Sequence, residues 1–203
     1  MTAKPAAIGC RAHSGWAALV IVAGPVSSPR ILDRRRIVIA DPAIPGSKQP
    51  YHTAEKMPFK QAEKLVTRCT ERSRALARQE LRAAVEHARN SGHEVAGCGI
   101  VLASGRPLPD LAATLASHAF IHTAEGELFR NVIAAASREL NVPVTEVKER
   151  ELLAQASAAL GKSETDLQSY LEKIGRELGP PWTQDEKCAT LAAWLALAAS
   201  RRE

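Results

Sequence analysis

Aromatic residues and long apolar runs are scarce in this sequence. Phe, Trp and Tyr make up 4% of the 203 residues, so a core has to be built from alanine, leucine, valine and isoleucine, which suits closely packed helices. No apolar run reaches the about 18 residues that a membrane-spanning helix needs. The segment from Met1 to Pro5 also lacks the apolar part of a secretory signal. We therefore expect a cytoplasmic protein that does not interact with membranes.

Cysteine motifs are missing as well. The cysteines, Cys10, Cys69, Cys98 and Cys188, lie far apart, and no two have the C-x-x-C spacing of a metal or redox site. We interpret them as buried, reduced thiols of a cytosolic protein, with a metal cluster or a disulfide framework as the alternative.

Charge of one sign does not dominate the sequence. The 27 Lys and Arg residues face 22 Asp and Glu residues, which leaves a net charge of +5. This modest excess allows a polyanionic partner such as DNA or RNA but does not require one.

The first 40 residues predict three consecutive antiparallel strands. Two runs of small and β-branched residues, over about 6–12 and 16–23, are separated by a segment, 11–15, that has the residue types of a hairpin loop. A third strand is predicted over 30–40, where three isoleucines share one parity.

The remaining chain alternates helices and strands. Prolines and a glycine predict a loop over 41–52. A helix over 58–90 and a central strand over 95–103 follow this loop. The next helix runs from Asp110 to about His122, and the segment from Thr123 to Leu140 continues this helix or starts another. A short strand over 141–147 and helices over 148–160, 163–178 and 183–200 complete the chain. This order predicts a single α/β domain over residues 1–203, with a mixed five-stranded sheet and extra C-terminal helices.

The helix over 58–90 combines an apolar stripe with a basic face. The stripe consists of Leu65, Cys69, Leu76, Ala84 and Ala88. The other face carries Lys60, Lys64, Arg68, Arg72, Arg74, Arg78, Arg82 and Arg89, with glutamates interleaved at pairing distance. We interpret this face as solvated. The alternatives are a polyanion-binding surface and a contact with a second subunit in a homodimer.

Two other sets of residues have ordinary structural interpretations. The run Arg34 to Arg36 is typical of a sheet edge that is protected against pairing with another strand, and the alternative is that it binds a nucleic-acid backbone. The three tryptophans, Trp16, Trp182 and Trp194, are interpreted as core anchors.

Motifs near both ends of the chain accompany this strand order. Ile8 to Arg11 followed by Ser14 to Ala17 resembles I-G-x-D … T-G-W-A, the opening motif of RuvC-type Holliday-junction resolvases in the ribonuclease H superfamily. The segment from Trp182 to Trp194 is similar to the final helix of that family, roughly D-x-x-D-A-x-A-x-A, and 142–147 is similar to its last strand. The resemblance implies a ribonuclease H-like fold and a nuclease site in which acidic side chains hold divalent metal ions.

The acidic residues of such a site are largely missing. Arg11 stands where the first acidic ligand belongs, and 103–105 follows the central strand where the second belongs. Only Asp185 and Glu186 remain near the C-terminal position. Because a guanidinium repels Mg²⁺, we expect nuclease activity to be absent or altered, with Arg11 paired to Asp185 or Glu186 in place of the metals.

Polar residues at the ends of two strands form a first candidate site. Arg11, His13 and Ser14 end the first strand region, while Ser104 and Arg106 follow the central strand. If these strands are neighbours, the five residues meet in a cationic, hydroxyl-rich pocket that suits phosphate or another anion.

A second candidate site consists of His118, His122 and Glu125. The spacings of four and three place these side chains on one face of a continuous helix, which suits a transition metal. The alternative is a set of hydrogen-bonded, inert residues between helix and sheet. Asp185 and Glu125 are also the candidate catalytic carboxylates.

The sequence thus predicts a nucleic-acid-associated protein of resolvase-like or nuclease-like fold, with DNA or RNA as partner and with nuclease activity absent or altered. The alternative is a small-molecule or anion-binding enzyme that uses the His, Glu and Arg residues at the C-terminal ends of the strands. A purely structural, partner-binding domain is the third class. A divalent metal is the candidate cofactor, and the sequence leaves open whether the chain is an enzyme.

Overall fold

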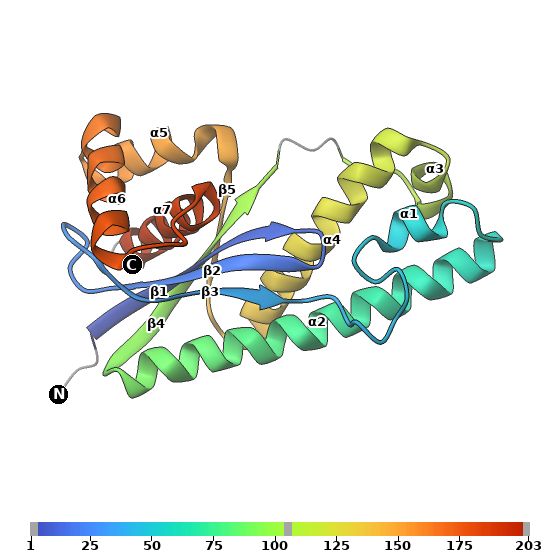
Figure 1. Cartoon of the computed structure of the whole chain (residues 1–203), viewed down its shortest axis with the longest axis horizontal. Coiled ribbons are helices and arrows are strands. Elements are labelled where there is room, and N and C mark those ends of the chain that lie inside the picture. The colour runs from blue at the N-terminus through green and yellow to red at the C-terminus, as the bar shows by residue number, and fades with distance from the viewer. Residues whose placement is uncertain (1–3, 104–106, 201–203) are drawn as a thin grey trace.

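The sheet at the centre of the molecule has the predicted strand order. The computed structural model describes residues 4–103 and 107–200. Its strands are β1 (Lys4–His13), β2 (Trp16–Ala23), β3 (Arg30–Val38), β4 (His93–Leu102) and β5 (Val144–Lys148), in the order β3-β2-β1-β4-β5 (Figure 1). Neighbours among β1, β2 and β3 are antiparallel, whereas β4 runs parallel to β1 and β5 runs parallel to β4. The expected mixed five-stranded α/β sheet is confirmed.

Helices cover both faces of this sheet. They are α1 (Pro50–Ala54), α2 (Phe59–Asn90), α3 (Leu111–Leu115), α4 (His118–Glu139), α5 (Glu149–Leu160), α6 (Glu164–Leu178) and α7 (Gln184–Ala199). Helices α2 and α4 lie along one face, while α7 lies on the other with α5 and α6 beside it (Figure 1). Within the described residues, no helix combines the length and hydropathy that crossing a bilayer requires.

Alternation along β1 separates the two helical layers. Ile8 and Cys10 pack under α2 and α4, whereas Gly9 faces α7. A Cβ atom on Gly9 would lie 1.9 Å from the carbonyl oxygen of Ala189, so the missing side chain lets α7 lie directly against the sheet. Arg11 has the same parity as Gly9 and therefore points to the α7 side.

A β-bulge in β3 changes which face its isoleucines occupy. The pairing with β2 shifts between Ile21 and Val22, which leaves Leu32 as the extra residue. As a result, Ile31 packs with the α7 layer, whereas Ile37 packs with the core under α2 and α4. The shared parity of the isoleucines therefore does not place them on one face.

The helix expected to start at Asp110 and to end at about His122 is two helices. Helix α3 ends at Leu115, and α4 begins at His118 and runs through Thr123 without a break. No glycine or proline marks the boundary. It arises because α3 packs onto a small core between α1 and α2 instead of extending α4.

The loop expected over 41–52 ends in a short helix. Helix α1 begins at Pro50, a residue that fits the first turn of a helix because it has no N–H group to satisfy. The loop prediction is therefore correct up to residue 49 and wrong beyond it.

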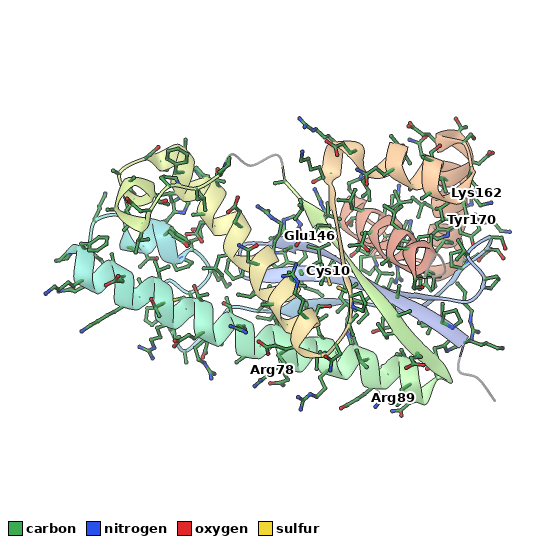
Figure 2. All side chains as sticks on the ribbon, turned by 180° about the vertical axis from the view of Figure 1, so that it is seen from behind. Cys10, Arg78, Arg89, Glu146, Lys162 and Tyr170 are labelled. Carbon is green, nitrogen blue, oxygen red and sulfur yellow. The ribbon has the colours of Figure 1, made fainter. Side chains whose placement is uncertain are left out.

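Helix α2 has the predicted basic face, and its buried stripe is shifted at two positions. It buries Val66 and Ala77 rather than their neighbours Leu65 and Leu76. All eight basic residues expected on the opposite face are exposed. Arg78, which is labelled in Figure 2, is one of them.

All four cysteines are buried and free, as expected.

Candidate functional site

Arg11 joins two acidic side chains at the N-terminal ends of two helices. Its Nη1 atom donates a hydrogen bond to Oδ1 of Asp185 in the first turn of α7. Its Nη2 atom donates to Oε1 of Glu149, the first residue of α5, over 2.7 Å. Of the two partners that the sequence suggested, Asp185 forms the pair, whereas Glu186 completes a capping box with Thr183. We call Arg11, His13, Glu149 and Asp185 the Arg11 cluster.

His13 connects this cluster to a stack of flat side chains. The Nε2 atom of His13 lies 2.8 Å from Oδ1 of Asp185, and it donates the proton because an ionised carboxylate only accepts. On its other side the imidazole stacks on Trp16, with ring centroids 4.4 Å apart. The guanidinium of Arg36 lies 3.9 Å from the Trp16 ring centroid. His13, Trp16 and Arg36, here called the Trp16 stack, form a row across β1, β2 and β3.

The charges in the Arg11 cluster keep one another ionised. Partial burial raises the pKa of Asp185, but the hydrogen bonds and positive charges of His13 and Arg11 outweigh it and hold this pKa below its usual range. Burial lowers the pKa of Arg11, but the hydrogen bonds and charges of Glu149 and Asp185 more than reverse this effect. Arg11 and Asp185 are therefore both charged near neutral pH.

The Arg11 cluster does not fit a pair of magnesium ions. A two-metal nuclease site needs several carboxylates whose oxygens converge on the ions. Here the guanidinium of Arg11 occupies one oxygen of Asp185 and one of Glu149, and its positive charge stands between them. These residues therefore offer Mg²⁺ no site as they are arranged.

The structure places the other residues of the first candidate site only in part. Ser14 is exposed in the turn between β1 and β2. Ser104 and Arg106 lie outside the described residues. The anion pocket expected from these three residues with Arg11 and His13 stays a prediction.

The three arginines of β3 have three different environments. Strand β3 is an edge strand, as the sequence indicated. Arg34 donates to backbone carbonyl oxygens of residues 178–181, between α6 and α7. Arg35 forms an ion pair with Asp33 at 3.2 Å. Arg36 is the exposed member of the three and is the one positioned to contact a ligand in solution.

Two of the three tryptophans are anchored by the fold as expected, and Trp16 is not. Trp194 is fully buried and donates from Nε1 to the carbonyl oxygen of Val26 over 2.7 Å. Trp182 is half-buried in the packing between α6 and α7. Trp16 is only partly buried and carries Arg36 on its ring face. Its interpretation as a core anchor is wrong because its cross-strand neighbours are polar flat groups rather than apolar side chains.

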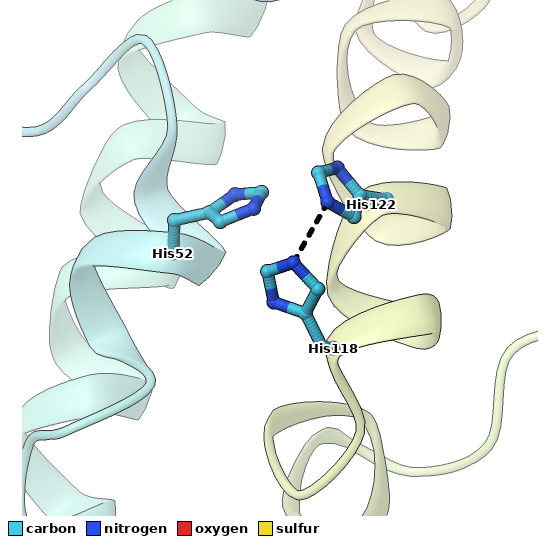
Figure 3. A group of neighbouring side chains, drawn as sticks. All are labelled: His52, His118 and His122. Atoms are coloured by element: carbon cyan, nitrogen blue, oxygen red, sulfur yellow. Dashed lines mark hydrogen bonds between the residues drawn. The ribbon is translucent and has the colours of Figure 1, made fainter.

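The second candidate site gains a residue from α1. His118 and His122 lie one turn apart at the start of α4, with their Nε2 atoms 3.0 Å apart. The ring of His52 on α1 approaches both, with centroid distances of 5.6 Å to His118 and 4.7 Å to His122 (Figure 3). One ring nitrogen from each residue lies within 4.8 Å of the others. We call these three residues the histidine cluster.

Glu125 lies behind His52 rather than beside the two histidines of α4. It is 3% exposed, and its Oε1 atom accepts hydrogen bonds from the backbone N–H groups of Tyr51 and His52, at 2.8 and 3.0 Å. The same oxygen lies 3.2 Å from Nδ1 of His52. Burial raises the pKa of Glu125, although the hydrogen bonds from His52 and Tyr51 partly offset this shift. Glu125 therefore caps the first turn of α1, where no residue of α1's own N-terminus does so.

The two candidate sites lie on opposite faces of the sheet. Arg11 and Asp185 belong to the α7 side, whereas His118, His122 and Glu125 are on α4, which covers the other side (Figure 1). Asp185 and Glu125 therefore do not face one another as a pair of carboxylates.

Replacing Glu125 by alanine is expected to loosen α1 and to lower stability by about 2 kcal/mol, because two N–H groups lose a charged acceptor. For a domain of this size, the melting temperature should fall by about 4–8 °C in thermal unfolding followed by circular dichroism. Glu125→Gln keeps an acceptor oxygen and should cost less than half as much. Equal melting temperatures for Glu125→Ala and the wild type would contradict the capping role.

Sequence reasoning missed two residues of these sites. Glu149 carried a usable signal, because it opens the helix after the last strand, as Asp185 opens the last helix. His52 carried none, since it meets His118 and His122 only through the tertiary fold.

Two solved structures of similar fold are of RuvC from Thermus thermophilus. T. thermophilus RuvC in complex with a Holliday junction substrate matches with a TM-score of 0.56 and 11% sequence identity, over 97% of this chain and 95% of the RuvC chain. A second Thermus thermophilus RuvC structure matches with a TM-score of 0.53 and 14% identity, over 97% and 96% of the two chains. No protein-family model and no curated protein matches the sequence. The structural likeness, together with the strand order, shows that this chain has the ribonuclease H-like fold of the RuvC resolvases.

Proposed function

We propose that this chain binds branched or otherwise structured DNA or RNA and does not cut it by two-metal chemistry. The proposal that the chain does not cut by two-metal chemistry rests on the position of Arg11. Arg11 stands at the end of β1, where the resemblance to the resolvases calls for an acidic metal ligand, and its guanidinium donates hydrogen bonds to Asp185 and Glu149. An internal cation there replaces the metal charge and uses the carboxylates that metals would need.

The Trp16 stack favours a nucleic-acid ligand. The exposed guanidinium of Arg36, which lies over the Trp16 ring, offers a flat surface on which an unpaired base can stack and positive charge for a phosphate. One of the similar RuvC structures holds a Holliday junction, so a four-way junction is the first ligand to test.

Binding is tested by fluorescence anisotropy with a labelled four-way DNA junction, a duplex and a single strand, over a range of NaCl concentrations. We expect the junction to bind more tightly than the duplex, with an affinity that falls steeply as salt displaces phosphate contacts. Light scattering on the same sample tests the homodimer that the sequence suggested. Binding that is absent at low salt for all three DNAs and for matched RNAs would contradict the proposed function.

The absence of cutting is tested with the same junction in Mg²⁺ or Mn²⁺, with T. thermophilus RuvC as the positive control. We expect the junction to stay intact with this chain. Cleavage by the wild type that Asp185→Asn abolishes would show an active metal site and defeat this part of the proposal.

The Arg36→Ala variant tests whether the Trp16 stack contacts the DNA junction directly or whether the junction is held by the overall positive charge of the protein. We expect at least about fivefold weaker junction binding, since base stacking and cation contacts of this kind are each worth about 1–3 kcal/mol. Arg89→Ala on α2 removes the same charge from an exposed position and is the matched control. Equal affinities for the two variants would mean that the Trp16 stack is not the contact surface.

A further inference from the structure

We propose that His52, His118 and His122 bind one Zn²⁺ ion, which joins α1 to α4. This site lies on α1 and the start of α4 and shares no residue with the proposed nucleic-acid surface. Glu125 acts as a positioning residue for His52 and does not itself contact the ion.

The geometry of the histidine cluster suits a tetrahedral ion. With zinc–nitrogen bonds of about 2.0–2.1 Å, two ligand nitrogens in a tetrahedral site lie about 3.3 Å apart. The Nε2 atoms of His118 and His122 are 3.0 Å apart, and one nitrogen from each of the three rings lies within 4.8 Å of the others (Figure 3). Because His118 and His122 are exposed, small rotations of their side chains can bring all three nitrogens to equal distance from one ion.

The choice of zinc follows from the donor set. Three neutral imidazoles without a contacting carboxylate or thiolate suit zinc and related transition ions, and they do not suit Mg²⁺ or Ca²⁺, which prefer oxygen ligands. Since two of the three rings face solvent, the fourth position is left to water.

Glu125 supplies the second observation that points to a metal. Its Oε1 atom receives Nδ1–H of His52, so the proton is held on Nδ1 and the lone pair of Nε2 is available to a ligand. A carboxylate that orients a histidine in this way is the usual support of a histidine metal ligand. The other oxygen of this carboxylate, Oε2, is buried and has no hydrogen-bond partner among the described residues. A buried acid with one unsatisfied oxygen is costly, which argues that its position serves the histidine in front of it.

The ion would add a second link between α1 and α4, beside the hydrogen bonds that Glu125 accepts from α1. Helix α1 has only five residues and follows a loop, whereas α4 has 22 residues and belongs to the main core. Zinc binding to the folded state alone should therefore raise the melting temperature by several degrees at saturating Zn²⁺.

The test uses the full chain, freed of any histidine tag and of metal by a chelator, and titrated with Zn²⁺ by calorimetry. Titration with Co²⁺ reports the geometry, because a tetrahedral cobalt site gives strong visible absorption. We expect one ion per chain, and clear loss of binding in His118→Ala and His122→Ala. His87→Ala, which removes an exposed histidine of α2, is the matched control and should bind as the wild type does.

Two more variants separate the roles of His52 and Glu125. His52→Ala should weaken binding as strongly as His118→Ala, whereas Glu125→Gln should keep one ion per chain with roughly tenfold lower affinity, the effect of losing an orienting partner. If Glu125→Gln abolished binding and His52→Ala did not, Glu125 would be the third ligand and the assignment would be overturned. No binding by the wild type, or equal binding by His118→Ala in a chain whose circular dichroism is unchanged, would overturn the site altogether. Junction binding is measured separately, so failure of either proposal leaves the other distinguishable.

Discussion

Gly99→Ala is expected to lower the melting temperature by at least about 6–12 °C or to prevent folding. A Cβ atom at Gly99 would lie 2.0 Å from the carbonyl oxygen of Ala192 and 2.3 Å from its carbonyl carbon. Both are backbone atoms of α7, which is held in place along its length by the sheet and by α5. Since the helix has no flexible side chain to move aside, the overlap should cost about 3 kcal/mol or more.

The neighbouring Gly97 is the control for this variant. It has the same parity on β4, but a Cβ atom there would lie 3.3 Å from Ala196, which a small shift can relieve. Gly97→Ala should therefore change the melting temperature by less than about 3 °C in the same differential scanning calorimetry experiment. Similar values for the two variants would show that α7 can move away from the sheet, contrary to the close packing described.

Replacing Arg11 is expected to uncover repulsion between Asp185 and Glu149. Arg11→Ala removes two charged hydrogen bonds in a region that is 20% exposed at Arg11 and Asp185, and should cost about 2 kcal/mol. Arg11→Asp places a third carboxylate beside the other two and should cost more. It also restores the acid found in the resolvase motif, so we expect Mg²⁺ to raise the melting temperature of Arg11→Asp by several degrees and to leave Arg11→Ala and the wild type unchanged.

The same cluster predicts the direction of acid sensitivity. The pKa of Asp185 in the folded chain lies below its unfolded value of about 3.9. Its pairing therefore contributes stability that is fully present above that unfolded value and is lost as the pH falls through the lower, folded pKa. Arg11→Ala should lose less stability than the wild type between neutral pH and pH 3, as measured by urea unfolding. A wild-type stabilisation by Mg²⁺, or an equal acid response of the two proteins, would contradict this account of the Arg11 cluster.

Local sequence patterns predicted most of the fold. The hairpin at β1 and β2, the small-residue strand β4 and the capping box of α7 are all formed by residues close in sequence, and their signals are strong. The predicted helix boundaries and strand faces were wrong where a contact between residues distant in sequence overrides the local preference. The split between α3 and α4 has no glycine or proline to mark it, and the bulge in β3 follows from its pairing with β2.

The candidate sites were predicted less completely. Arg11 and Asp185 could be found because each stands in a motif with a recognisable neighbour pattern, and His118 and His122 because helix geometry places residues four apart on one face. Glu149 could be recognised as the first residue of a helix, but its pairing with Arg11 spans 138 positions and no local pattern encodes that contact.

By itself the sequence determined the strand order, the presence of a cation where an acidic ligand belongs, and the two histidines on one helix face. These features depend on residue type and on periodicity over a few positions. Only the tertiary structure decided which residues complete each site. Glu125 accepts a hydrogen bond from His52 across 73 positions, and Glu149 accepts one from Arg11 across 138. The physical reason is that such long-range contacts are determined by sheet register and helix packing, and both of these depend on the whole chain.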